Sequence, residues 1–265
     1  MQAQAGGGAF QGIDMRNQAF GFRTDTGRRR DGNEDALLLL PSRGIFAVAD
    51  GVGGQNSGEV ASRKAMTGIE SFLYANPLSV ADGLEGKPRE NWLRSYFQRC
   101  MQKINSEIMK QAMSDPVMDR MATTVVLCYL DMESIYVVNM GDSRAYMFRD
   151  GELAQLSVDH TYVNNLINAG TLTRSEARQH PQKNIITKAL GSTTNTEPDF
   201  YRFDLMEGDR ILLCSDGLHG ELTDDEIADI VGSRNDMNTV CRLLVDAANE
   251  KGGHDNITVV CIENR

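Results

Sequence analysis

Four short apolar stretches follow one another after residue 121, and only two or three residues separate each from the next. They read TTVVLCYL, SIYVVNM, SRAYMFR and ELAQLSV, and the links between them contain aspartate and glycine. Short links of this composition are typical of antiparallel strands, whereas parallel strands need a crossover of a dozen or more residues. This part of the chain therefore predicts an antiparallel meander with strands paired in sequence order, and not a βαβ rhythm.

The remainder of the chain adds further strands and several helices. Strands are predicted over 18–23, 36–40, 45–49, 199–205, 210–214 and 256–262, and helices over 58–74, 90–112, 224–231 and 237–250. The 90–112 segment carries apolar residues at every third or fourth position, as expected for an amphipathic helix packed on a core. Strand meanders combined with paired helices favour a sandwich of sheets with helices outside.

No Pro/Ser-rich linker or internal repeat divides the 265 residues. A chain of this length suits one large domain or two small ones. We expect a flexible N-terminal lead-in over residues 1–17 and a single domain over 18–265. Residues 157–190 are polar and irregular, with short helical pieces.

Composition excludes several classes of protein. No stretch approaches the roughly 18 apolar residues of a membrane helix, and the N-terminus lacks the regions of a signal peptide. A net charge of −10 argues against nucleic-acid binding, which needs a basic face. Five cysteines without a C-x-x-C pair favour reduced core cysteines. We therefore expect a cytoplasmic protein that binds neither membrane nor nucleic acid.

Four aspartates stand where an apolar strand meets a loop, three of them next to a glycine and the fourth, Asp255, two residues after one. They are Asp50 in AVADGVGG, Asp142 in VVNMGDSR, Asp216 in LLCSDGL and Asp255 in GGHDNITVV. Any one Asp-Gly pair is a common turn signal. If the four converge, two carboxylates about 4 Å apart repel by roughly 4 kcal/mol at an effective dielectric of 20, so a cation would be needed. Oxygen ligands alone favour Mg²⁺ or Mn²⁺ over Zn²⁺.

The segment GRRRDGNEDALLL places Arg30 shortly before Glu34 and Asp35. One interpretation is a solvated basic loop. The other is that Arg30 grips a phosphate bidentately beside an acid cluster.

Five motifs in order resemble those of the metal-dependent protein phosphatases of the 2C type, with the bacterial serine/threonine phosphatase branch most similar. They are RDGNED (30–35), ADGVGG (49–54), GDSR (141–144), SDGL (215–218) and G-x-DNIT (253–258). The resemblance spans about residues 18–262. It implies an α+β fold in which two antiparallel β-sheets pack as a sandwich flanked by pairs of α-helices.

The resemblance also implies roles for individual residues. Asp50 would bridge two metal ions, and the Gly51 carbonyl would bind one of them. Asp216 and Asp255 would complete the ligands of the first ion. Glu34 and Asp35 would act through metal-bound waters, and Arg30 would hold the substrate phosphate. Asp142 would help to bind a third ion, and Asn256 would be a supporting residue. Residues 157–190 would form a flap beside the active site.

The activity implied is hydrolysis of phosphoserine and phosphothreonine in proteins by a water or hydroxide that bridges two Mn²⁺ or Mg²⁺ ions. In bacteria such an enzyme would oppose a cognate serine/threonine kinase in signalling, and we expect a monomer. Family members often carry a histidine near the ADG motif as a candidate acid for the leaving group. Val52 and Gln55 stand there in this chain, which leaves His160 or a metal-bound water for that task. The other interpretation of His160 is a structural or capping role.

Other classes fit less well. No lysine follows Gly58 as a Walker A loop requires, and Asn56 stands where a Rossmann loop has its third glycine. No cysteine has an arginine six residues later, so a Cys-x5-Arg phosphatase is excluded. The remaining alternative is a catalytically silent phosphatase-like binding module. Such modules usually lose a metal aspartate or the phosphate-gripping arginine, and this chain retains both.

Overall fold

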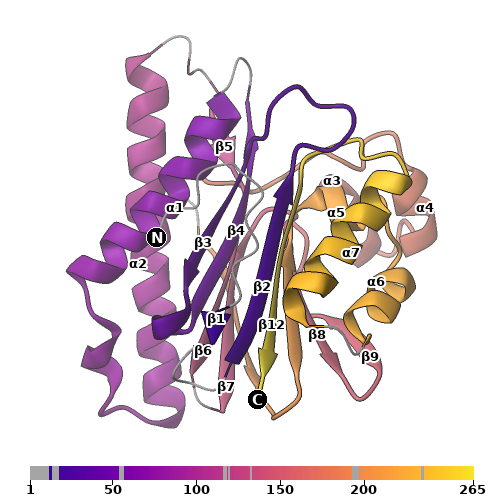
Figure 1. Ribbon diagram of the computed structural model, residues 1–265. Coiled ribbons are helices and arrows are strands. Elements are labelled where there is room, and N and C mark those ends of the chain that lie inside the picture. The colour runs from indigo at the N-terminus through magenta and orange to yellow at the C-terminus, as the bar shows by residue number, and fades with distance from the viewer. Residues whose placement is uncertain are drawn as a thin grey trace.

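Two antiparallel sheets stand face to face in the computed structural model, and helices cover the outer face of each (Figure 1). The structure describes residues 12–13, 18–53, 57–115, 118, 120–131, 133–192, 197–233 and 236–265. The α+β sandwich flanked by helices is confirmed. No helix within these ranges is long and apolar enough to cross a membrane.

The first sheet has the order β1-β2-β12-β11-β8-β9. Its strands are β1 (Gly12–Ile13), β2 (Gln18–Asp25), β8 (Arg144–Arg149), β9 (Glu152–Gln155), β11 (Arg210–Cys214) and β12 (Ile257–Asn264). Within the expected lead-in 1–17, Gly12–Ile13 pair with β2, and the other residues of that stretch lie outside the described ranges. The N-terminal strand β2 thus pairs with the C-terminal strand β12, which joins distant parts of the chain in one sheet.

The second sheet has the order β10-β7-β6-β4-β3, with a short β5 paired to β4. Its strands are β3 (Asp35–Leu40), β4 (Ile45–Val52), β5 (Ala122–Thr123), β6 (Val125–Asp131), β7 (Ser134–Met140) and β10 (Asp199–Asp204). The helices α1 (Ser57–Ala75) and α2 (Gly86–Ser114) cover this sheet. The helices α5 (Asp216–His219), α6 (Asp224–Val231) and α7 (Met237–Glu250) cover the first.

Three apolar layers follow from strand alternation. Along β4, Ala47 and Ala49 face α1 and α2, whereas Phe46 and Val48 face the other sheet. Successive side chains of a strand point to opposite faces, so β4 is buried on both. The same alternation aims Asp50, two residues beyond Val48, at the end of the space between the sheets.

The predicted meander is wrong at one link. β6 pairs with β7 and β8 pairs with β9, but β7 and β8 lie in different sheets. The Gly141-Asp142 link is therefore a crossover between the two sheets and not a hairpin turn. Gly141 makes the change of direction with a φ of +114°, a conformation that favours glycine.

Residues 157–190 run beside this crossover and contain two short helices, α3 (Tyr162–Asn168) and α4 (Arg174–Gln179). Both helices begin at a threonine whose side chain accepts a backbone N–H. A bridge between Thr161 and Ile186 joins the two ends of the segment to each other, and a bridge between Thr123 and Leu190 joins its end to β5. The His160 N–H donates to the Gly141 carbonyl, which ties the start of the segment to the crossover.

Candidate active site

Asp35 and Asp50 face each other across two neighbouring strands. They are paired residues in the antiparallel register of β3 and β4, so their side chains emerge on the same face of the sheet. That face is the one that Phe46 and Val48 present to the other sheet. β4 continues to Val52, so Asp50 lies inside the strand and not at its end, where the sequence placed it. The two carboxylates thus replace the apolar core at one end of the sandwich.

Asp216 and Asp255 approach from the opposite sheet. Asp216 is the first residue of α5, directly after Ser215 at the end of β11, and Asp255 precedes β12. The Ser215 hydroxyl donates to Asp35 Oδ2 at 2.8 Å, which joins the two sheets within the site. Asp216 is within hydrogen-bonding reach of Asp50. Four of the predicted carboxylates are therefore brought together.

Asp142 lies at the crossover and is 5% exposed. Its backbone carbonyl accepts a hydrogen bond from Nε2 of the partly buried His219 at 3.0 Å. Burial holds the pKa of His219 down, to about 3, so the ring is neutral and carries its proton at Nε2. Asp142 is therefore buried in a link between the two sheets and does not lie in a hairpin turn.

The loop between β2 and β3 carries Arg30 and Glu34 to the same end (Figure 1). Arg30 Nη2 donates to Asp255 Oδ2 at 2.7 Å, and about half of the Arg30 side chain is exposed. Asn256 holds the loop in place. Its Oδ1 accepts from the Glu34 N–H at 2.8 Å, and its Nδ2 donates to the carbonyls of Thr26 and Gly32.

Two glycines of the ADGVGG region allow β4 to approach the start of α1. A Cβ on Gly51 would lie 2.1 Å from the Gly58 carbonyl oxygen, and one on Gly58 would lie 2.8 Å from the Glu34 carboxyl group. Such contacts exclude any side chain, so the glycines bring the backbone close to the acids. Val52 is exposed. Gln55 lies outside the described residues.

The carboxylates perturb one another. Burial, reinforced by the charges of Asp216 and Asp255, raises the pKa of Asp35 to about 7. Burial and the charge of Asp255 raise the pKa of Asp216 to about 6. Burial and neighbouring carboxylates hold the pKa values of Asp50 and Asp142 well above the usual range. Burial also raises the pKa of Glu34. The cluster therefore resists carrying its full negative charge.

The donor set fits a hard divalent cation. All of the clustered donors are oxygens, which Mg²⁺ and Mn²⁺ prefer. Buried Oδ1 atoms of Asp35, Asp142 and Asp216 have no hydrogen-bond partner, and an unpaired buried acceptor is costly unless a cation or water reaches it. Across the described part of the chain, no three acidic, histidine or cysteine side chains are grouped so that they could hold a metal ion as they stand. Coordination would thus require these side chains to adjust.

Two threonines that the sequence analysis did not assign support Asp50. The Asp50 N–H donates to Thr124 Oγ1 at 2.9 Å, and the Asp50 carbonyl accepts from Thr123 Oγ1 at 2.9 Å. Thr124 Oγ1 also lies 2.7 Å from the hydroxyl of Ser143 in the crossover. The signal in the sequence was the Thr-Thr pair ahead of an apolar strand, which reads as ordinary strand residues.

His160 lies against the crossover and not among the carboxylates. Its Nδ1 accepts the Gly141 N–H at 3.0 Å, and its Nε2 lies 3.2 Å from Asp199 Oδ2.

Comparison with known proteins agrees with this architecture. Residues 26–256 match the family model of protein phosphatase 2C. The serine/threonine phosphatase stp of Listeria monocytogenes is 34% identical over 246 residues, which cover 91% of this chain and 94% of the relative.

Two solved structures are similar over nearly the whole chain. The Mycobacterium tuberculosis serine/threonine phosphatase PstP/Ppp has a TM-score of 0.82 and 32% identity, with 93% of this chain and 98% of that chain covered. The catalytic domain of the serine/threonine protein phosphatase PstP in complex with two manganese ions has a TM-score of 0.79 and 31% identity, with coverages of 93% and 97%.

These similarities show that the sandwich is that of a phosphoprotein hydrolase. The chain belongs to the protein phosphatase 2C family. It is a serine/threonine protein phosphatase of the bacterial type.

Proposed function

We propose that this phosphatase uses two divalent cations, Mn²⁺ or Mg²⁺, held by the side chains of Asp50, Asp216 and Asp255 and by the carbonyl of Gly51. Glu34 and Asp35 would act through bound waters, and Asp142 would hold a third ion. The observation that carries the proposal is the convergence of Asp35, Asp50, Asp216 and Asp255 at one end of the sandwich. Burial and neighbouring charges raise the pKa values of the first three, and buried Oδ1 atoms of Asp35 and Asp216 have no hydrogen-bond partner. The two manganese ions in the PstP relative support it.

The cations, when bound, would supply Lewis acidity toward the phosphoryl oxygens and lower the pKa of a bound water. Arg30 would bind the phosphoryl group, since its guanidinium is about half exposed and one nitrogen already reaches the cluster at Asp255. A planar guanidinium offers two parallel donors to two phosphate oxygens. Asn256 and Ser215 would keep the loop and both sheets in register, so that this geometry exists before substrate arrives.

The finer biological assignments belong to the same proposal. The substrates would be phosphoserine and phosphothreonine proteins, and a serine/threonine kinase would be the opposing partner. Residues 157–190 would form a flap of a single domain that spans 18–265. We propose a cytoplasmic monomer without membrane contact.

The decisive experiment measures release of phosphate from a phosphothreonine peptide by the purified chain with Mn²⁺, with Mg²⁺ and after EDTA. Turnover should require the cation and be abolished in Asp50→Asn. Asp229→Asn is a matched control, because Asp229 is exposed and lies on the covering helix α6. Turnover that survives EDTA, or persists in Asp50→Asn, would reject the metal assignment. Peptide binding without any turnover would restore the silent-module alternative.

A further inference from the structure

His160 sits between the crossover that carries Asp142 and the edge strand β10. Its backbone N–H donates to the Gly141 carbonyl at 2.9 Å, while its Nδ1 accepts the Gly141 N–H at 3.0 Å. Both backbone polar groups of Gly141 are thus held by one residue. The side chain of His160 is only 14% exposed, so water does not compete freely for these contacts.

The hydrogen bonds determine where the ring carries its proton. A nitrogen that accepts a hydrogen bond has no proton, so the neutral ring is protonated at Nε2. That atom lies 3.2 Å from Asp199 Oδ2, and it donates to this carboxylate. Both ring nitrogens are therefore engaged, one with the crossover and one with β10. Neither nitrogen is left to deliver a proton to a leaving group.

Hydrogen bonds from neighbouring side chains hold the Asp199 carboxylate in place. Lys188 Nζ donates to its Oδ1 at 2.8 Å, and the Tyr201 hydroxyl donates to its Oδ2 at 2.8 Å. Burial alone would raise the pKa of Asp199, but the hydrogen bonds from His160, Lys188 and Tyr201 hold that pKa well below its ordinary value. The carboxylate therefore stays ionised and keeps the imidazole oriented.

A second set of bonds ties the same crossover to the 157–190 segment. Asn139, which lies opposite Asp199 in the β7–β10 register, donates from Nδ2 to the carbonyls of Val158 at 2.9 Å and Gly141 at 3.3 Å. The His160 carbonyl accepts from the Thr187 N–H at 2.8 Å. The crossover is thus fixed by Asn139 of β7 and by residues of the 157–190 segment.

We propose that His160 is a positioning residue, anchored by Asp199, that holds the Gly141-Asp142 crossover so that the Asp142 carboxylate faces the cluster. The inference rests on the proposed function only in treating Asp142 as part of the working site. The proposal excludes His160 as the acid that protonates the leaving group, a role that the sequence left open.

Two substitutions at His160 separate positioning from proton donation. His160→Asn retains an oxygen near the place of Nδ1 and can still accept the Gly141 N–H. His160→Gln retains an N–H near the place of Nε2 and can still donate to Asp199, but it loses the acceptor. Neither side chain is an acid, so both substitutions would abolish proton donation equally. Positioning predicts that His160→Asn retains most activity, whereas His160→Gln and His160→Ala lose about 10- to 100-fold in kcat, as for other groups that orient metal ligands.

Two substrates sharpen the comparison. An alkyl phosphate such as phosphothreonine needs a proton on its leaving oxygen, whereas p-nitrophenyl phosphate does not. Positioning predicts that His160→Ala lowers turnover of both substrates by a similar factor. Loss of phosphopeptide turnover by about 10²–10⁴-fold in both His160→Asn and His160→Ala, with p-nitrophenyl phosphate turnover retained, would identify His160 as the general acid and overturn the proposal.

A readout independent of catalysis is hydrogen exchange of the Gly141 amide, followed by NMR. The amide should exchange about 2- to 10-fold faster in His160→Ala and His160→Gln, and near the wild-type rate in His160→Asn. His180→Ala is the control, since His180 lies in the same segment and bonds only locally, to the Gln182 N–H. Unchanged Gly141 exchange in His160→Ala overturns the proposal.

The exchange result also separates this proposal from the proposed function. If the wild type fails to hydrolyse either substrate with Mn²⁺, the metal assignment fails while the Gly141 exchange still decides the role of His160. Should His160→Ala not fold, Asp199→Asn supplies the missing test. That variant keeps an acceptor for Nε2 but removes the charge, and positioning predicts slower turnover of both substrates by the same factor.

Discussion

Replacing Asp216 by asparagine should stabilise the cation-free protein while abolishing its activity. Burial and the charge of Asp255 raise the pKa of Asp216 from an ordinary 3.8 to about 6. At 1.36 kcal/mol per pKa unit, ionising this carboxyl group in the folded protein at pH 7 costs about 3 kcal/mol. Asparagine avoids that cost and can still accept a hydrogen bond from Asp50, but as a neutral acceptor it weakens that bond by about 1 kcal/mol. The variant should be about 2 kcal/mol more stable.

The change of folding stability with pH tests the same argument. The unfolded chain releases the Asp216 proton near pH 4 and the folded chain near pH 6, so the folded state binds more protons in between. Wild-type stability should therefore fall through this window as the pH rises. This contribution should be absent in Asp216→Asn and present in Asp229→Asn. Urea unfolding in EDTA between pH 4 and pH 8, followed by circular dichroism, measures both effects.

Addition of Mn²⁺ should reverse the order of stabilities. A ligand at 100 times its Kd stabilises the folded state by about 2.7 kcal/mol, and the wild type should show such a gain. Asp216→Asn should gain much less, because a charged ligand has been removed. A variant that is less stable than wild type in EDTA at pH 7 would refute the repulsion argument. An equal Mn²⁺ gain in both proteins would refute the assignment of Asp216 as a ligand.

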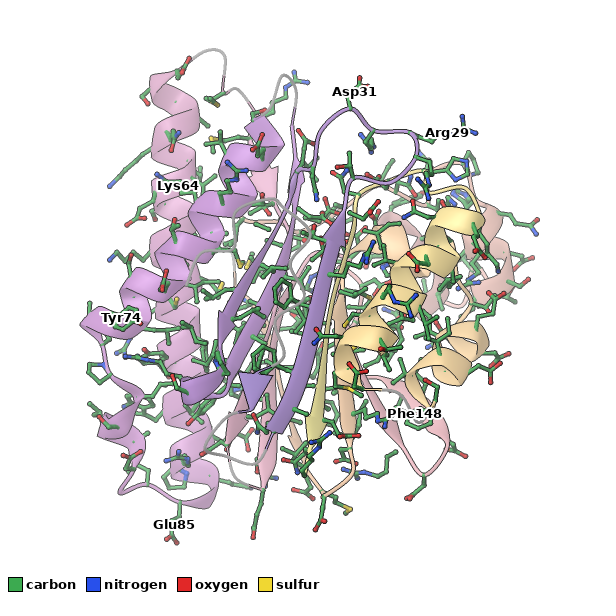
Figure 2. The ribbon with its side chains drawn as sticks, viewed as in Figure 1. Arg29, Asp31, Lys64, Tyr74, Glu85 and Phe148 are labelled. Atoms are coloured by element: carbon green, nitrogen blue, oxygen red, sulfur yellow. The ribbon has the colours of Figure 1, made fainter. Side chains whose placement is uncertain are left out.

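Three further predictions concern the same site. Alkylation of the native enzyme should leave turnover intact, because all five cysteines are buried and none is required as a nucleophile; inactivation of the folded enzyme would contradict this. Arg30→Ala should lower kcat/KM toward a phosphopeptide about 10- to 150-fold, from the loss of a charge-assisted hydrogen bond. Arg29→Ala is the control, since Figure 2 shows Arg29 projecting from the outer side of the loop; equal effects would reduce Arg30 to a solvated charge. Asp142→Ala should lose most of kcat while calorimetry still detects the bound metal pair. Loss of all metal binding would instead make Asp142 a core ligand, and full activity would leave it without a role.

Local patterns determined much of the fold. The predicted helices 224–231 and 237–250 match α6 and α7, because an apolar stripe of helical period defines a face that must be buried. The strands were found with errors of a few residues at their ends, since alternation of apolar residues reports on burial. The acids beside glycine indicated the site for a physical reason that local sequence carries: a short acid needs a backbone that can approach closely, as Gly51 and Gly58 allow.

Tertiary structure alone decided which segments are neighbours. The three-residue link 141–143 has the composition of a hairpin turn, yet it passes between the sheets. The reason is that β7 pairs with β10 and β8 pairs with β11, strands more than 50 residues later in the chain. Those distant pairings bury Asp142. They also place Asp199 beside His160, 39 positions away, and Asp255 beside Arg30, 225 positions away. Residue type and spacing indicate what chemistry a side chain can perform. Long-range packing determines which partner it has, and therefore which atom carries a proton or a charge.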